Sequence, residues 1–107
     1  MTTSKTILIT GASRGIGLRT AKSLASRGHT VYAGMRDVGG RNKGAAVELA
    51  AFAGEANGRI LPVELDVTDE ATCNTVVAKI EAETPIDVLI NNAGVMPVGL
   101  TEAYTLE

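Results

Sequence analysis

Short apolar segments and longer amphipathic segments alternate along the 107 residues of this chain. The apolar segments have the length of β-strands and lie at Thr6–Thr10, Thr30–Gly34, Arg59–Leu65 and Asp87–Ile90. The segments between them place apolar residues at helical spacing and lie at Gly15–Arg27, Lys43–Ala56 and Asp69–Glu83. Connections of this length predict parallel strands joined by right-handed crossovers. The alternation therefore predicts an α/β fold, a doubly wound parallel sheet that binds its ligand at the carboxyl ends of the strands.

The same spacing predicts which side chains face the core. One face of the second predicted helix carries Ala46, Leu49, Ala50 and Ala53, and one face of the third carries Cys73, Val76, Val77 and Ile80. Thr68 can cap the third helix, and Pro62 indicates that its strand lies near a sheet edge. We expect His29 to be exposed in the turn after Gly28, and Tyr32 to pack within its strand.

Composition and charge exclude several function classes. A formal net charge of −2 and a sequence pI of about 5.4 provide no basic patch for nucleic acid or for a membrane surface. The single cysteine, Cys73, excludes a disulfide framework and a cysteine-based metal cluster, and metal-ligand spacings are absent. No apolar run approaches the ~20 residues that span a bilayer. We expect one domain over residues 1–107, located in the cytoplasm.

Three glycines, Gly11, Gly15 and Gly17, lie between the first predicted strand and the first predicted helix. A helix N-terminus presents unpaired backbone N–H groups and about half a positive charge, and glycines let an anion approach them. This pattern favours phosphate binding over the simpler alternative, in which the glycines only permit a tight turn. The spacing Gly-x-x-x-Gly-x-Gly is neither the common dinucleotide fingerprint, which fails at Thr20, nor a P-loop, which fails at Ala45.

Three short motifs follow the first, third and fourth predicted strands. They are TGASRGIG at Thr10–Gly17, LDVTD at Leu65–Asp69 and NNAG at Asn91–Gly94. In this order and at these strand ends, the motifs resemble the short-chain dehydrogenase/reductase family over the whole chain. The resemblance implies a Rossmann-like sheet with strand order 3-2-1-4, truncated after the fourth strand, and a nicotinamide cofactor.

The resemblance also implies which residues contact that cofactor. The pyrophosphate and the adjoining ribose would be surrounded by Gly11, Ser13, Arg14, Gly15, Ile16 and Gly17. Asp66 and Val67 would meet the adenine ring, and the ribose and nicotinamide side of the cleft would be lined by Asn91, Ala93 and Gly94. Asp66 could instead help to cap the following helix. Asn92 is expected to be a buried residue that ties adjacent strands, because a buried amide must satisfy its hydrogen bonds.

The residues after the second predicted strand bear on the choice between NAD and NADP. An acid about twenty positions past the glycines usually accepts bonds from the ribose hydroxyls of NAD, and Asp37 has that spacing. Alignment with the family instead puts Met35 at the selecting position, with Arg36 directly after it. Arg36 and Arg14 can clamp a 2′-phosphate through charge-assisted bonds; the alternative is that both are solvated surface charges. We expect NADP rather than NAD, with Asp37 pointing outward or pairing an arginine.

The family's proton relay, as the resemblance implies it, is a tyrosine with a lysine four residues later. The lysine lowers a tyrosine pKa that is otherwise near ~10. Tyr104 would need a lysine beyond the last residue. Tyr32 is followed by Arg36 along a strand, where four residues span ~13 Å, against ~6 Å on a helix. His29 and Cys73 have no catalytic partner, so no residue is assigned as catalytic.

We therefore expect the cofactor-binding half of an oxidoreductase that reduces a carbonyl or oxidises an alcohol of a small-molecule substrate, and that binds cofactor weakly and without turnover by itself. The predicted strand Asp87–Ile90 would be an unpaired apolar edge. Either the chain is an incomplete product of a longer reading frame, or it forms a homo-oligomer through that edge. Two alternatives are a non-catalytic NADP(H)-binding module and a methyltransferase. Turnover of ketones with NADPH tests the first, and titration with S-adenosylmethionine tests the second.

Overall fold

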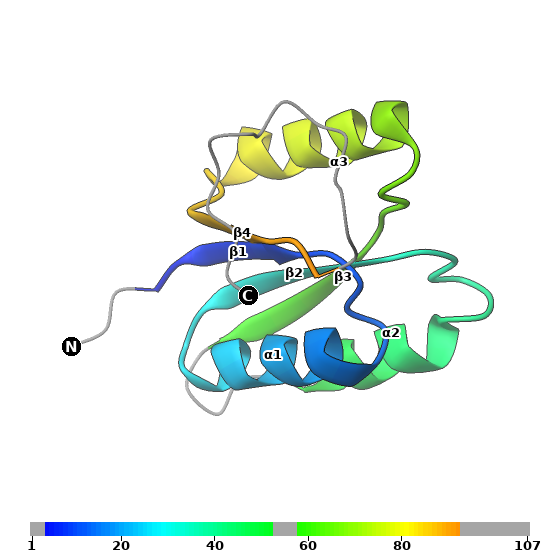
Figure 1. Cartoon of the computed structure of the whole chain (residues 1–107). Helices are drawn as coiled ribbons and strands as arrows, with labels where there is room; N and C mark the ends of the chain where they lie inside the picture. The colour runs from blue at the N-terminus through cyan, green and yellow to red at the C-terminus, as the bar shows by residue number, and fades with distance from the viewer. Residues whose placement is uncertain (1–3, 53–57, 93–107) are drawn as a thin grey trace.

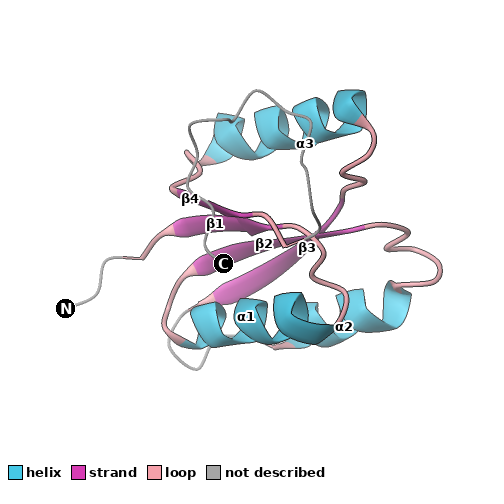
Figure 2. Cartoon of the chain, viewed as in Figure 1, coloured by secondary structure: helices cyan, strands magenta, loops and turns pink. Residues whose placement is uncertain are grey.

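The computed structural model describes residues 4–52 and 58–92 of the chain. Strands and helices alternate in the predicted order: β1 (Thr6–Ile9), α1 (Gly15–Ser26), β2 (Thr30–Met35), α2 (Lys43–Ala51), β3 (Arg59–Glu64), α3 (Glu70–Glu83) and β4 (Val88–Ile90). All strand pairs are parallel, and the sheet order is β3-β2-β1-β4. Helices α1 and α2 cover one face and α3 covers the other (Figures 1 and 2). The doubly wound sheet and its order are confirmed.

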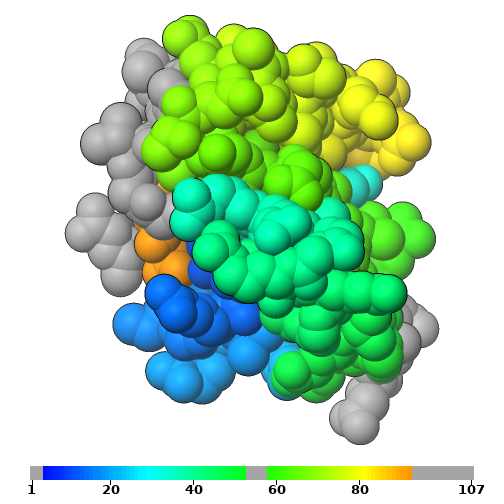
Figure 3. Space-filling view, turned by 90° about the vertical axis from the view of Figure 1, so that its right-hand side faces the viewer, coloured from blue at the N-terminus to red at the C-terminus, as the bar shows by residue number. Residues whose placement is uncertain are grey.

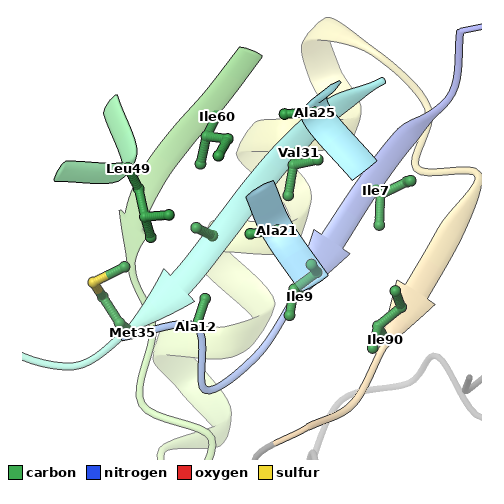
Figure 4. Close-up of a cluster of buried hydrophobic side chains, with 11 residues drawn as sticks. Ile7, Ile9, Ala12, Ala21, Ala25, Val31, Met35, Leu49, Ile60 and Ile90 are labelled. Atoms are coloured by element: carbon green, nitrogen blue, oxygen red, sulfur yellow. The ribbon is translucent and has the colours of Figure 1, made fainter. Parts of the chain in front are cut away.

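The larger core lies between the sheet and the helices α1 and α2 (Figure 4). Every second residue of a strand points to the same face, so each strand contributes alternate side chains to this core. The sheet contributes Ile7, Ile9, Val31, Ala33, Met35, Ile60 and Ile90, and the helices contribute Ala21, Ala25 and Leu49. The two alanines of α1 let that helix lie close to the sheet. Only five residues connect the end of β1 to the start of α1, so the two lie at the same end of the sheet.

The opposite face of the sheet packs against α3. Leu8 on β1 is level with Tyr32 on β2 and with Leu89 on β4, and Ile80 of α3 joins the same buried cluster. Tyr32 is only 7% exposed, which confirms its predicted packing role. Pro62 lies on β3, the edge strand, as its missing N–H group predicts. In the part of the chain described, no helix has both the length and the apolar character needed to cross a membrane.

The buried face of α2 differs from the prediction. Leu49 is the buried residue of this helix, and Ala45 and Ala46 pack beside it as half-buried side chains. Ala50 is exposed, so its assignment to the inner face is wrong. Ala45 takes its place, so the face of α2 that contacts the core consists of Ala45, Ala46 and Leu49. Ala53 lies outside the described residues.

Two side chains near strand ends also differ from the prediction. Asp69, rather than Thr68, caps α3, because its carboxylate accepts a hydrogen bond from the backbone N–H of Thr72 at 3.1 Å. His29 is buried rather than exposed. Its Nδ1 accepts a hydrogen bond from the backbone N–H of Lys5 at 3.1 Å, so the turn is enclosed by the segment that leads into β1.

Candidate functional site

A cleft of about 720 Å³ lies at the carboxyl ends of the strands. Figure 3 views this end of the molecule, with the green-cyan atoms of the segment after β2 across its middle. The lining residues come from the segments that follow all four strands: Gly11, Ser13, Arg14, Gly15, Met35, Arg36, Arg41, Asn42, Leu65, Asp66, Val67, Thr68 and Asn92. This is where a doubly wound sheet binds its ligands.

The cleft brings together seven of the predicted site residues: Gly11, Ser13, Arg14, Gly15, Arg36, Asp66 and Val67. Ile16, Gly17 and Asn91 do not line it. Ile16 is 67% exposed on α1, Gly17 is buried, and Asn91 is half-buried. Ala93 and Gly94 lie outside the described residues.

Sequence reasoning did not assign six of the residues that line the cleft to the site: Met35, Arg41, Asn42, Leu65, Thr68 and Asn92. Of these, Met35 had only been aligned with the selecting position of the family. Leu65, Thr68 and Asn92 belong to the LDVTD and NNAG motifs, so their positions beside assigned residues were a usable signal. Arg41 and Asn42 carry no such signal. They reach the cleft because the segment between β2 and α2 folds back toward Arg36, whose carbonyl accepts a hydrogen bond from the side-chain amide of Asn42.

The glycine turn between β1 and α1 is shaped by two different requirements. Gly15 has φ +62°, a left-handed conformation that other residues rarely adopt, and a Cβ there would meet open space. Gly17 is instead constrained by packing. A Cβ at this position would lie 2.3 Å from the carbonyl oxygen of Gly11 and 2.7 Å from Nδ2 of Asn92. The start of α1 therefore rests directly on the chain that leaves β1.

The N-termini of α1 and α3 differ in whether a side chain of the protein caps their unpaired backbone N–H groups. At α3, the Asp69 side chain accepts a backbone hydrogen bond and Glu70 adds a carboxylate in the first turn. At α1, the residue in the capping position is Arg14, which makes no side-chain capping bond, and the first turn has no acidic residue. The positive end of the α1 dipole therefore faces the cleft without a carboxylate from its own helix. This arrangement suits an anion such as a diphosphate.

Hydrogen bonds join the end of β4 to the end of β1 beside this turn. The Thr10 hydroxyl donates to Oδ1 of Asn91 at 3.1 Å and accepts from the backbone N–H of Asn92 at 2.9 Å. The side-chain amide of Asn92 donates to the carbonyl of Gly11 at 3.1 Å. Asn92 thus ties the two strand ends as predicted, but it is exposed rather than buried. Its amide can both fix the glycine turn and line the cleft.

Three arginines, Arg14, Arg36 and Arg41, converge on the cleft. None of them forms an ion pair with another residue of the described segments, where the only ion pair joins Lys22 and Glu48. Asp37 does not line the cleft. Its carboxylate accepts a hydrogen bond from the backbone N–H of Arg41 at 3.0 Å, so it bonds an arginine's main chain rather than its guanidinium group.

Asp66, which follows β3, supplies a carboxylate to the same cleft. Its Oδ1 accepts hydrogen bonds from the hydroxyl of Thr68 at 2.6 Å and from the backbone N–H of Thr68 at 3.0 Å. These two bonds, and the nearby positive charge of Arg36, lower the pKa of Asp66 below its ordinary value. The carboxylate is therefore ionised at neutral pH and can accept a bond from a ligand amine. It does not cap α3, because Asp69 has that role.

Parallel topology, a helix N-terminus without a side-chain cap and a cleft at the strand ends are the features of a nucleotide-binding α/β domain. Residues 5–107 match the family model described as short chain dehydrogenase. The chain belongs to the short-chain dehydrogenase/reductase family.

Relatives share this region of the sequence. Human "Retinol dehydrogenase 8" is 41% identical over 106 residues, which cover 95% of this chain and 32% of that protein. "L-rhamnose 1-dehydrogenase (NAD(P)(+))" of Azotobacter vinelandii is 40% identical over 97 residues, which cover 87% of this chain and 36% of the relative. The chain thus spans about a third of the length of these relatives.

Solved structures share the fold. A short-chain type dehydrogenase/reductase from Mycobacterium ulcerans superposes with a TM-score of 0.73 at 29% identity, over 85% of this chain and 33% of that one. A short-chain dehydrogenase from Sphingobium yanoikuyae, solved in complex with NADPH, has a TM-score of 0.65 at 35% identity, over 85% of this chain and 34% of that one.

Proposed function

We propose that residues 1–107 form the cofactor-binding half of an NADP-dependent oxidoreductase, which reduces a carbonyl or oxidises an alcohol of a small-molecule substrate. Membership of the family supports the reaction class. The related dehydrogenase from Sphingobium yanoikuyae was solved with NADPH. When bound, the nicotinamide cofactor supplies or accepts the hydride, and the residues of this chain bind and orient it.

The chemistry of the lining residues fits such a cofactor. The uncapped N-terminus of α1 would hold the diphosphate, with Gly11, Ser13, Arg14 and Gly15 lining the cleft there and Ile16 and Gly17 following in the first turn of the helix. The ionised carboxylate of Asp66 would accept a bond from the adenine amine, with Val67 against the ring. Asn91, Ala93 and Gly94 would lie toward the nicotinamide.

The observation that carries the preference for NADP is the convergence of three arginines on one cleft, none of them paired with an acid in the described segments. A 2′-phosphate would give these guanidinium groups an anionic partner, and guanidinium groups bind phosphate through charge-assisted, often bidentate bonds. The acid with the spacing typical of an NAD-binding site, Asp37, has its carboxylate bonded to the main chain of Arg41. It does not line the cleft, so it would not contact a ligand there.

Titration of the purified chain with NADPH and NADH tests the proposal. We expect NADPH to bind at least about tenfold more tightly, because hydrogen bonds between charged groups contribute about 1.5–3 kcal/mol. Arg36→Ala should remove most of this preference and leave NADH binding unchanged. Arg59→Ala is the matched control, because Arg59 is exposed at the other end of the sheet, where β3 begins. Equal or tighter binding of NADH by the unmodified chain would refute NADP selectivity, and binding of neither nucleotide would refute the cofactor site.

A further inference from the structure

The segment between β2 and α2 makes a tight turn with one residue in the left-handed conformation. Asp37 has φ +55°, the left-handed region that residues other than glycine rarely occupy. Its carbonyl accepts hydrogen bonds from the N–H groups of Gly40 and Asn42 at 3.1 and 3.0 Å, and its carboxylate accepts one from Arg41. These bonds turn the chain back on itself, which brings Arg41 to the same cleft as Arg36.

One side chain from another strand completes this turn. Glu64, the last residue of β3, is level with Met35, the last residue of β2. Its Oε2 accepts a hydrogen bond from the N–H of Asp37 at 2.8 Å, and its Oε1 accepts one from the N–H of Val38 at 3.0 Å. Both carboxylate oxygens are therefore bonded to the main chain of the turn, immediately after Arg36.

We propose that Glu64 is a positioning residue that holds the Asp37–Asn42 turn and thereby sets the preference of the cleft for a nucleotide 2′-phosphate. The inference rests on the proposed NADP site, which it deepens. Glu64 does not line the cleft and would touch no ligand. It acts through the backbone that carries Arg36 and Arg41.

Positioning and simple electrostatics predict opposite effects for this residue. A carboxylate near a phosphate site repels the ligand, so removing its charge would by itself tighten the binding of a 2′-phosphate. If Glu64 holds the turn, removing an acceptor lets the turn adopt other conformations, and the apparent affinity falls in proportion to the fraction that remains competent. The sign of the change in affinity therefore distinguishes the two roles.

The test is Glu64→Gln in the full chain, titrated with NADPH and NADH and with adenosine 2′,5′-bisphosphate and 5′-AMP. Glutamine keeps the size of the side chain but replaces one acceptor oxygen with an NH₂ group, which cannot accept a bond from a backbone N–H. We expect the ratio of NADPH to NADH affinity, and that of the bisphosphate to 5′-AMP, to fall about fivefold, as for a turn that is competent about one-fifth of the time. Affinity for NADH and 5′-AMP should change little.

Glu81→Gln is the matched control. The Glu81 carboxylate also accepts a backbone N–H bond, from Ile86 at 2.9 Å, but it lies near the end of α3 that is remote from the cleft. The Glu81→Gln variant should lose about as much unfolding free energy as Glu64→Gln and keep the NADPH to NADH affinity ratio of the unmodified chain. Glu64→Asp keeps the charge but is too short to reach both N–H groups, so it should lower the ratios as glutamine does. This variant decides the matter if the glutamine variant does not fold.

Unchanged or increased ratios in folded Glu64→Gln or Glu64→Asp would overturn the inference while leaving the NADP site in place. Equal falls in Glu64→Gln and Glu81→Gln would also overturn it, because the effect would then be one of general stability. An unmodified chain that shows no preference for NADPH would remove the proposed selectivity and the inference together.

Discussion

Replacing Gly17 with alanine tests whether α1 rests directly on the glycine turn. The added Cβ would lie 2.3 Å from the carbonyl oxygen of Gly11, about 1 Å inside the 3.4 Å at which ordinary contact begins. Overpacking of this kind costs about 1–3 kcal/mol. The bond from Asn92 to Gly11 would be lost as well, at about 1 kcal/mol. The higher helix propensity of alanine offsets somewhat less than ~1 kcal/mol, so we expect a net loss of about 2 kcal/mol.

Two other glycines serve as matched controls for the same substitution. Gly15 has open space around its Cβ position but a φ of +62°, so alanine there is strained without a clash and should cost about 1 kcal/mol. Gly44 lies in α2 with open space and no positive φ. Alanine at this position should stabilise the fold by about 0.5 kcal/mol, because glycine is a poor helix former.

Urea unfolding followed by far-UV circular dichroism measures all three variants against the unmodified chain, with the m-values compared to check that the unfolding transition is unchanged. The expected order of midpoints is Gly44→Ala highest, then the unmodified chain, then Gly15→Ala, with Gly17→Ala lowest. NADPH titration of the folded variants should show weakened binding for Gly15→Ala and Gly17→Ala only. A Gly17→Ala midpoint equal to that of the unmodified chain, or above that of Gly15→Ala, would refute the close packing inferred here.

Three further expectations follow from burial and hydrogen bonding. Leu49→Ala should cost about 3 kcal/mol by emptying a fully buried site, whereas Val47→Ala, at a 59% exposed position, should change the unfolding free energy by less than ~0.5 kcal/mol; similar costs would contradict the packing of α2. Burial raises the pKa of the Cys73 thiol, so a disulfide reagent should label it slowly in the native chain and quickly in urea, and equal rates would show that it is exposed. Bonds from Thr72 lower the pKa of Asp69 in the folded chain. The ionised carboxylate therefore stabilises the fold above about pH 4, and this contribution to the unfolding free energy is lost as pH falls through the lowered pKa. Asp69→Asn, which still caps but does not titrate there, should weaken the acid dependence of the melting temperature.

The sheet could be predicted from the sequence because its signals are local and consistent. A strand such as Ile7–Ile9 is buried on both faces, which gives the continuous apolar run expected of a central parallel strand. The glycines and the LDVTD and NNAG motifs stand directly after such runs, and the parallel arrangement brings all strand ends to one side of the sheet. Placing the seven predicted residues that line the cleft therefore needed only the strand boundaries and the strand order.

The failures arise where a contact from a distant segment decides the outcome. His29 was expected to be exposed because it follows a glycine in a turn, but the side chain is buried and its ring accepts a hydrogen bond from the backbone N–H of Lys5, 24 residues earlier. The inner face of α2 was misjudged because alanines at neighbouring positions give almost equal periodicity, and the packing angle on the sheet decides between Ala45 and Ala50. Neither choice is encoded within the helix or the turn itself.

The residues that bear on the choice between NAD and NADP also depend on a contact with a distant segment, which the local sequence does not reveal. Counting along the chain places Asp37 where an acid typical of an NAD site would stand. The direction of its carboxylate, however, depends on a left-handed backbone turn that Glu64 holds from 27 residues away. A count of residues fixes how far an acid lies from the glycines, but only the contact between β3 and the segment after β2 fixes whether that acid lies in the cleft. The proposed selectivity therefore depends on the ends of β2 and β3 and on the turn that follows β2, and Arg41 could be assigned to the cleft only once that turn was known.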